Sequence, residues 1–523
     1  MSAKRILKEM NNRWHILLVF LWCALWGLQG VDMSDEGWLL SAYQQAYHCP
    51  ESVTSVFLYY STVAVGGLWN ILFGWMGMYG FRLLYALNTA LIAGTTYLIL
   101  KDHINRWAVF LGTVIVLLAQ NYGCIVFHHN QFTPLLLSLS ILFLKRQKPL
   151  FSGILLGITF FARLPNITLL SLLVLFIVHA HYHSVKTTLR PLSLYLSGII
   201  AGCLGILAYM LAVGHFSVFI NSVSSLGDAA NVSDSTHNLS YMLGIYTTDW
   251  LHVFYQMLLP VWPLYDHVTY LYAFCTLVLL ASLYIHGNQE QHVCLSLAAL
   301  IILYVQPLGS DFGIGNMGVF SIWLAVPLTC GYLYNLCKKW RLLLFAIPAA
   351  YYGYQCTYAL LTGCMSDYGG RWNMTYRIHH PLATTFTTQA NMIAADSLLM
   401  VLPHYVQPDD YLLCYQNTPM IHYYTHTRPY LYNPWLFTYD SANFSKCIER
   451  AKQEIPTLPV VVRDKGGYAT WHEYTPDWNN DQGTDSYLHT NRKITLLNQF
   501  LHDGGYTVVW ENAVFQILSP QKR

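Results

Sequence analysis

Apolar runs long enough to cross a bilayer recur from Trp14 to Leu361, and short polar joints separate them. A helix needs about 20 mostly apolar residues to span the hydrocarbon core. Only 10% of the residues are charged and 54% are hydrophobic, whereas about a quarter of an average soluble chain is charged. This pattern excludes most soluble enzymes and disorder, and it predicts a polytopic α-helical membrane protein. The formal net charge of +2 provides no basic field for nucleic acid.

The positions of the basic residues predict an orientation, since cytoplasmic joints carry an excess of Lys and Arg. With the N-terminus cytoplasmic, 14 of the 16 Lys and Arg residues of the apolar part lie on the inner side. This arrangement requires about eleven spans and an extracytoplasmic C-terminal part, periplasmic if the cell is bacterial. The predicted spans are 14–30, 81–100, 107–124, 133–144, 150–164, 166–182, 192–213, 270–285, 293–309, 317–336 and 342–362.

The composition changes after Thr362, where charged residues, Pro, Asn and short β-like runs replace the long apolar stretches. We therefore divide the chain into a transmembrane domain, residues 1–362 with a first outer loop at 31–80, and a C-terminal domain, residues 363–523. Short apolar runs such as 459–463 are typical of buried strands. The C-terminal domain is predicted to be a soluble α/β domain with alternating strands and helices at 411–415, 445–454, 460–462, 495–502, 506–510 and 514–518.

Three carboxylates, Asp32, Asp35 and Glu36, follow the first predicted span at once. In a helix they would share one face. Like charges this close raise at least one pKa or recruit a cation, which suits a general base or a divalent metal ion beside a phosphate. The structural alternative is a helix cap made by Ser34 and Asp35.

The rest of the first outer loop predicts elements that lie at the membrane surface. An apolar stripe with Trp38, Tyr43 and Tyr47 marks a short amphipathic helix. Residues 53–78 could be a further span, but that would invert the side of every later joint, so we interpret them as a second surface element. The carboxylates would then lie at the depth of the lipid headgroups, and Arg82 would reach the same depth.

Other candidate groups lie on the predicted outer side. Arg82 and Arg163 violate the charge bias and should have anionic partners, although a side chain that snorkels to the headgroups is equally compatible. His128, His129 and Asn130 can bind a phosphate or a sugar hydroxyl, or add a ligand to the acidic cluster; the alternative is a polar turn. Residues 214–269 are predicted to begin as a mobile loop over the site and to continue as a surface or re-entrant helix at 251–265.

The acidic motif after the first span, the surface elements, the many spans and the outer C-terminal domain together resemble the GT-C superfamily of membrane glycosyltransferases. The similarity is greatest to the protein-mannosyltransferase-like and aminoarabinose-transferase-like branch. It implies transfer of a sugar, with inversion, from a polyprenyl-phosphate-linked donor to a hydroxyl or phosphate of a lipid, glycan or protein acceptor. It also implies that Asp35 or Glu36 is the base or a metal ligand, and that Arg82 and Arg163 bind the lipid phosphate.

Three other classes are compatible with such a chain. A transporter or flippase of a lipid-linked or anionic substrate is the main alternative, although transporters usually contain related halves and the sequence shows no internal repeat. A glycan polymerase or ligase and a non-catalytic receptor are the others.

Overall fold

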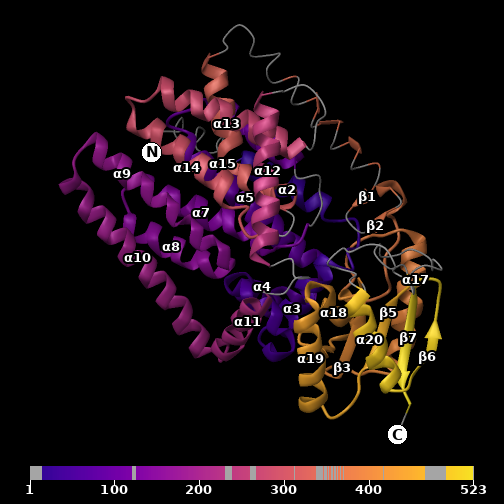
Figure 1. Ribbon diagram of the computed structural model, residues 1–523. Helices are drawn as coiled ribbons and strands as arrows, with labels where there is room; N and C mark the ends of the chain where they lie inside the picture. The colour runs from indigo at the N-terminus through magenta and orange to yellow at the C-terminus, as the bar shows by residue number, and fades with distance from the viewer. Residues whose placement is uncertain are drawn as a thin grey trace.

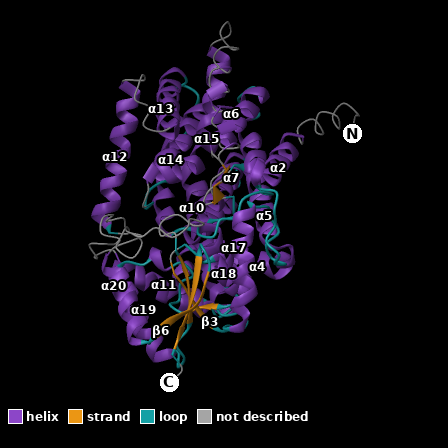
Figure 2. Ribbon diagram, turned by 90° about the vertical axis from the view of Figure 1, so that its right-hand side faces the viewer, coloured by secondary structure: helices purple, strands orange, loops and turns teal. Residues whose placement is uncertain are grey.

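The computed structural model describes residues 14–119, 125–229, 238–258, 267–310, 313–336, 370–415, 417–465 and 491–521, with scattered residues between 346 and 368. A body of helices leads into a smaller region with a sheet near the C-terminus (Figure 1). The sheet lies beyond one end of the helical body, as the view at right angles shows (Figure 2).

Every predicted span from 14–30 to 317–336 coincides with helical structure. The helices concerned are α2 (Trp14–Trp26), α5 (Gly77–Leu100), α6 (Arg106–Ala119), α7 (His129–Lys145), α8 (Pro149–Ala162), η3 (Leu164–Leu173), α9 (Val174–Tyr182), α10 (Val185–Ala212), α13 (His267–Ile285), α14 (Glu290–Val305) and α15 (Gly313–Leu336). The last predicted span, 342–362, lies mostly outside the described residues.

Five described helical segments are long and apolar enough to cross a membrane: Pro50–Leu100, Leu164–Tyr182, Val185–Ala212, Val268–Ile285 and Met317–Leu336. Several of these segments also expose apolar side chains on their outer surface. On α10, for example, Ile200, Leu204 and Leu211 are each about 60% exposed, as expected for side chains that face lipid rather than water. The chain therefore has membrane-protein character, whereas the full count of eleven spans is not confirmed.

Helices α8 and α10 approach each other closely through four glycines. Gly153 and Gly157 of α8 face Gly198 and Gly202 of α10, and a Cβ at any of them would overlap backbone of the other helix. Glycines spaced by four residues let helix backbones pack in lipid, where apolar side chains alone provide no driving force. The two helices run side by side in Figure 1.

The first outer loop is helical, as predicted. It contains α3 (Asp35–Gln45), η1 (Pro50–Tyr59), α4 (Tyr60–Phe73) and η2 (Gly74–Met76). The start of α4 is buried between α3 and α8, whereas Ile71 and Leu72 near its far end and Trp75 in η2 are 62–77% exposed. The segment also belongs to Pro50–Leu100, which is long and apolar enough to cross a membrane, so the placement of residues 53–78 at the membrane surface stays a prediction.

The prediction for residues 214–269 was partly wrong. The Ser- and Asn-containing stretch expected to be a mobile loop forms α11 (Phe216–Ala229), and a second helix, α12 (Leu239–Leu258), begins well before the predicted 251. Residues 230–237 and 259–266 lie outside the described part. Helix α11 is amphipathic, and Val218 and Phe219 pack into a core shared with the first outer loop, which explains why its polar residues do not prevent a helix.

The C-terminal region contains a five-stranded mixed sheet in the order β4-β3-β5-β7-β6. Its strands are β3 (Tyr411–Tyr415), β4 (Arg428–Pro429), β5 (Val460–Asp464), β6 (Tyr506–Glu511) and β7 (Phe515–Pro520), and a separate pair is formed by β1 (Gly363–Cys364) and β2 (Asp367–Tyr368). The associated helices are α17 (Gln389–Val401), α18 (Met420–Thr425), α19 (Ser441–Glu454) and α20 (Asn491–Asp503), with short turns η4 (Arg371–Asn373), η5 (Leu402–His404) and η6 (Leu436–Thr438). The alternating strands and helices predicted from the sequence for this region are therefore present.

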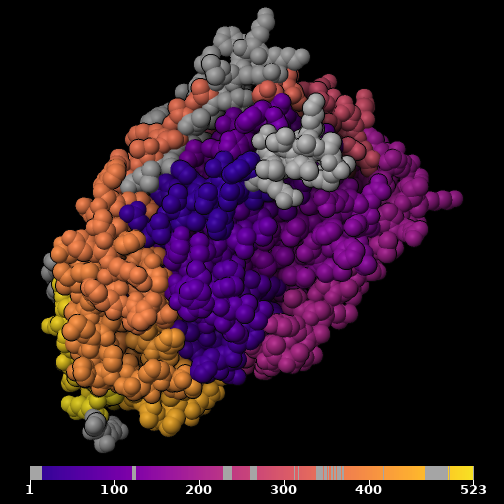
Figure 3. Space-filling view, turned by 180° about the vertical axis from the view of Figure 1, so that it is seen from behind, coloured from indigo at the N-terminus to yellow at the C-terminus, as the bar shows by residue number. Residues whose placement is uncertain are grey.

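Helix α18 of this region packs directly on α3. The backbone of Met420 donates a hydrogen bond of 3.0 Å to the carbonyl of Met33, and a Cβ at Gly37 would overlap the backbone of Met420. Residues of the two segments share one hydrophobic core. From behind, the C-terminal region and the N-terminal helices form one continuous surface (Figure 3).

The glycine contacts between α8 and α10 generate a prediction. Gly202→Leu should lower the thermal unfolding temperature of the purified protein in detergent, because overpacking costs about 1–3 kcal/mol or more. The matched change Gly205→Leu lies on the same helix but meets nothing within 4 Å, so it should leave the unfolding temperature unchanged. Equal effects of the two changes would contradict this packing.

Candidate functional site

Helix α3 begins inside the acidic motif. The Asp32 carboxylate accepts hydrogen bonds from the backbone of Ser34 at 2.9 Å and of Glu36 at 3.1 Å, and from the Ser34 hydroxyl at 2.7 Å. These are orphan donors of the first turn. Ser34 occupies the N-cap position, as the sequence-based alternative expected, but its side chain makes no cap hydrogen bond; the Asp32 carboxylate accepts from the first turn instead.

Glu36 and Arg82 form a buried, bidentate ion pair. Arg82 Nε lies 2.8 Å from Glu36 Oε1, and Arg82 Nη2 lies 2.6 Å from Oε2. The other donors of the guanidinium reach the carbonyls of Gly27, Gln29 and Gly30 at 2.8–3.0 Å. Burial raises the pKa of Glu36, and the Arg82 guanidinium opposes that increase. All five N–H groups of Arg82 are engaged, so the predicted phosphate-binding role of Arg82 and the predicted catalytic role of Glu36 give way to a structural one.

The C-terminal region holds the carbonyls that surround Arg82. Asp367 accepts a hydrogen bond of 2.8 Å from the backbone of Val31, while Gly30 and the carbonyl of Leu28 pair with the backbone of Phe386. The Arg371 guanidinium lies 4.4 Å from the Trp26 ring centroid and donates to the Trp26 carbonyl. Sequence reasoning missed Asp367 and Arg371, because more than 300 residues separate them from the loop that they hold.

Asp35 is placed differently from the other two carboxylates. It is half-buried, whereas Asp32 and Glu36 are buried. Helix α3 is otherwise almost entirely covered, and Trp38, one turn after Asp35 and on the same side of the helix, is also half-buried. Of the three acidic residues, Asp35 is therefore the one that is partly accessible from outside the protein.

A row of rings runs from Trp38 into the helical body, and we call it the aromatic row. The ring of Trp38 lies 6.0 Å from that of Tyr59, and Tyr59 stacks on His129 at 3.7 Å with an interplanar angle of 11°. The members of the row, from the C-terminal region to α15, are Trp435, Trp38, Tyr59, His129, His128 and Phe320. The structure thus brings two of the predicted site residues, His128 and His129, toward the acidic motif.

The polar atoms at the inner end of the row are buried. Among the described residues, His128 Nε2, His129 Nδ1 and Asn130 Oδ1 have no hydrogen-bond partner. Buried polar groups normally have one, so these atoms suit a ligand or ordered water. Arg163 is 3% exposed, donates to the carbonyl of Gln306 at 2.8 Å and lies within electrostatic range of His129.

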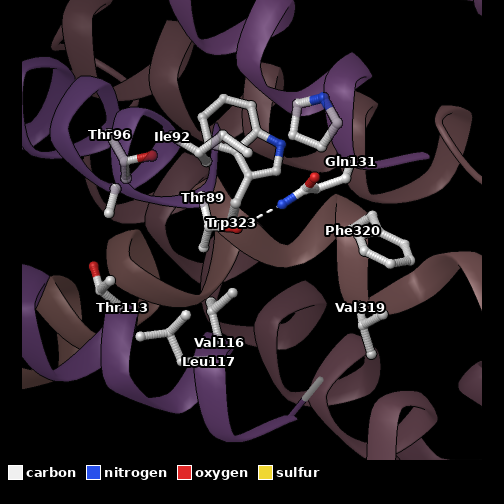
Figure 4. Close-up of a pocket in the computed structure, with 12 residues that line it drawn as sticks. Thr89, Ile92, Thr96, Thr113, Val116, Leu117, Gln131, Val319, Phe320 and Trp323 are labelled. Atoms are coloured by element: carbon white, nitrogen blue, oxygen red, sulfur yellow. Dashed lines mark hydrogen bonds between the residues drawn. The ribbon is translucent and has the colours of Figure 1, made fainter. Parts of the chain in front are cut away.

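A small pocket continues from Phe320 into the helical body between α5, α6, α7 and α15 (Figure 4). Its volume is about 40 Å³, room for about three water molecules. The side-chain amide of Gln131 donates to the Thr89 hydroxyl at 2.6 Å across it, while the side-chain oxygen Oε1 of Gln131 and the indole nitrogen of Trp323 have no partner among the described residues. The pocket is therefore apolar but able to hold water.

The predicted metal site at Asp32, Asp35 and Glu36 does not fit this geometry. Both oxygens of Glu36 face Arg82, and those of Asp32 accept backbone hydrogen bonds. In the described part of the chain, the three carboxylates do not form a group whose ligand atoms converge. No chemical step is therefore assigned to a metal ion here.

The ion pair generates a stability prediction. Arg82→Gln should cost about 3–5 kcal/mol, because it leaves the Glu36 carboxylate buried without a counter-charge. Adding Glu36→Gln should recover part of that loss, and thermal unfolding of the single and double variants measures the coupling. Arg146→Gln, which removes an exposed guanidinium, is the control. Strictly additive losses would contradict the pairing.

Asp367 generates a pH prediction. Burial raises the pKa of this carboxyl to about 6, although Thr387, Val31, Asn391 and Arg82 act in the opposite direction. Between its ordinary value of 3.8 and about 6, the folded protein binds more protons than the unfolded chain. Its contribution to stability is therefore present at pH 4 and lost, by up to about 3 kcal/mol, as the pH rises through 6.

Asp367→Asn should remove this contribution, so unfolding temperatures measured from pH 4 to 7 should decrease less in the variant than in the unmodified protein. Identical pH profiles would show that Asp367 has the same pKa in the folded and in the unfolded protein.

Comparison with known proteins yields no match, either to a protein-family model or to a curated protein. The function is therefore argued from Asp35, the aromatic row and Arg163.

Proposed function

We propose that the protein is a membrane glycosyltransferase of GT-C type. In this proposal, eleven spans place the N-terminus in the cytoplasm and α3 and the C-terminal region at the outer face. There it transfers a sugar, with inversion, from a polyprenyl-phosphate-linked donor to a hydroxyl or phosphate acceptor. The resemblance of the acidic motif and its surroundings to that superfamily supplies the reaction class.

The observation that carries the proposal is that the three carboxylates of the acidic motif have different surroundings. Glu36 is neutralised by Arg82 and Asp32 caps the helix, whereas Asp35 remains half-exposed beside Trp38 at the start of the aromatic row. A base must reach the proton that it removes, and Asp35 is the carboxylate of the motif that can do so. Asp35 is therefore our catalytic residue.

The reaction needs one base because the departing lipid phosphate is already a good leaving group. Asp35 removes the proton of the acceptor hydroxyl, whose oxygen forms a bond with the anomeric carbon. The bond from that carbon to the phosphate oxygen breaks, and its electron pair stays on the phosphate. Displacement from the side opposite the phosphate inverts the anomeric centre.

The remaining groups suit the donor. Arg163 and the polar atoms of His128, His129 and Asn130 lie at the inner end of the row, where a buried cation stabilises the charge of the departing phosphate. Trp38 and Tyr59 offer ring faces for the sugar. The pocket beside Phe320 continues among the transmembrane helices, in the direction from which an isoprenoid chain would approach.

A transporter or flippase is the second candidate, supported by the buried, mostly apolar pocket between α5, α6, α7 and α15, in which Gln131 Oε1 and Trp323 Nε1 have no partner among the described residues. It would move its substrate without breaking the sugar–phosphate bond. Chemical consumption of the donor therefore separates the two functions.

The test uses the full chain in lipid nanodiscs with a panel of radiolabelled polyprenyl-phosphate hexoses and pentoses. Release of polyprenyl phosphate is measured with and without added membrane lipid, glycan and peptide acceptors. Asp35→Asn should slow release by about 10²–10⁴-fold, the usual contribution of a general base, with an unchanged unfolding temperature.

Glu51→Gln is the matched control, since Glu51 is an exposed carboxylate of the same outer loop; it should keep full activity. Undiminished release in Asp35→Asn would remove the catalytic assignment. Donor that crosses the membrane of proteoliposomes intact would favour the transporter instead.

A further inference from the structure

Two histidines and a glutamate converge at the opposite end of the helical body from α3. His179 and His183 lie one turn apart at the end of α9, and Glu290 is the first residue of α14. His179 Nδ1 lies 2.5 Å from Glu290 Oε1, and His183 Nε2 lies 2.8 Å from Oε2. One ligand atom from each residue falls within 4.8 Å of the others, so the three side chains form one group of candidate metal ligands.

This donor set is characteristic of a transition metal. Two imidazole nitrogens and one carboxylate oxygen are common Zn²⁺ ligands, with metal–ligand distances of about 2.0–2.2 Å. In a tetrahedral site of those dimensions the ligand atoms are about 3.3 Å apart. The contacts at Glu290 need to widen by only about 0.5–0.8 Å for an ion to enter, and side-chain rotation can supply that.

A neighbouring hydrogen bond holds the candidate ligands in place, and their side chains remain partly exposed to solvent. The hydroxyl of Tyr182, between the two histidines, donates to the carbonyl of Gly287 in the turn that precedes Glu290. The turn therefore stays fixed against α9. The side chains of His179, His183 and Glu290 are 36%, 51% and 25% exposed, which leaves room for water as a fourth ligand.

We propose that His179, His183 and Glu290 form a Zn²⁺ site that clamps the end of α9 to the start of α14. In the predicted topology this end faces the cytoplasm, far along the chain from the acidic motif. The bound ion would replace the hydrogen bonds to Glu290 with stronger bonds to a shared metal. The site acts on stability and helix packing, and it is independent of the proposed transferase activity.

The experiment measures Zn²⁺ binding to the full chain, purified in detergent through a histidine-free affinity tag and stripped with a chelator. Competition with a chromophoric zinc indicator gives affinity and stoichiometry. The chain contains 22 histidines, so the readout is the difference between variants. The double variant His179→Ala/His183→Ala should lose one equivalent of tightly bound ion, and Glu290→Gln should weaken binding at least tenfold.

His181→Ala is the matched control, because His181 is an exposed histidine between the two ligands and outside their group. It should bind Zn²⁺ as the unmodified protein does. Zn²⁺ should also raise the thermal unfolding temperature of the unmodified protein and of His181→Ala, since a ligand of the folded state stabilises it, and should leave that of the double variant unchanged. Equal stoichiometry and equal thermal shifts in all variants would overturn the proposal.

Discussion

The buried pair between Glu36 and Arg82 places the strongest constraint on the extracytoplasmic half of the proposed architecture. A guanidinium taken out of water needs a partner for each of its donors, and here three carbonyls of residues 27–30 complete what the carboxylate begins. Those carbonyls are presented only because Asp367 and Phe386 hold the same loop from the other side. The first outer loop and the C-terminal region are therefore mutually dependent, and α18 packs on α3 as part of the same core.

Local features of the fold could be predicted because their signal is local. Helices occur wherever the apolar runs predicted them in the described part, and the strand predicted at 411–415 has those bounds. The expectation that Arg82 has an anionic partner is also met, by Glu36. That partner is a side chain of the protein rather than a lipid phosphate, and nothing in the spacing of 46 residues distinguishes the two.

The remaining features depend on contacts that no single stretch of sequence contains. Tyr59 and His129 stack only after η1 and the start of α7 meet, and Asp367 reaches Val31 across 336 residues. Helix α11 was predicted as a loop because of its Ser, Asn and Asp residues, whereas its apolar residues Val218 and Phe219 pack into a core supplied by other segments. By contrast, the glycine pairs of α8 and α10 are visible in the sequence at a spacing of four, and that signal was available without the structure.

The arrangement of the motif explains how two adjacent carboxylates acquire different roles. Successive residues of a helix point about 100° apart, so when Glu36 turns inward to Arg82, Asp35 must turn toward the side where α3 is open. In the proposed reaction Asp35 receives the acceptor proton, because Arg82 engages Glu36 and Asp32 accepts hydrogen bonds from the start of α3. A free pair of carboxylates would instead share protons and recruit a cation. Pairing Glu36 with Arg82 leaves Asp35 as the half-exposed carboxylate of the motif, which is the position that the proposed displacement of a lipid phosphate needs for its base.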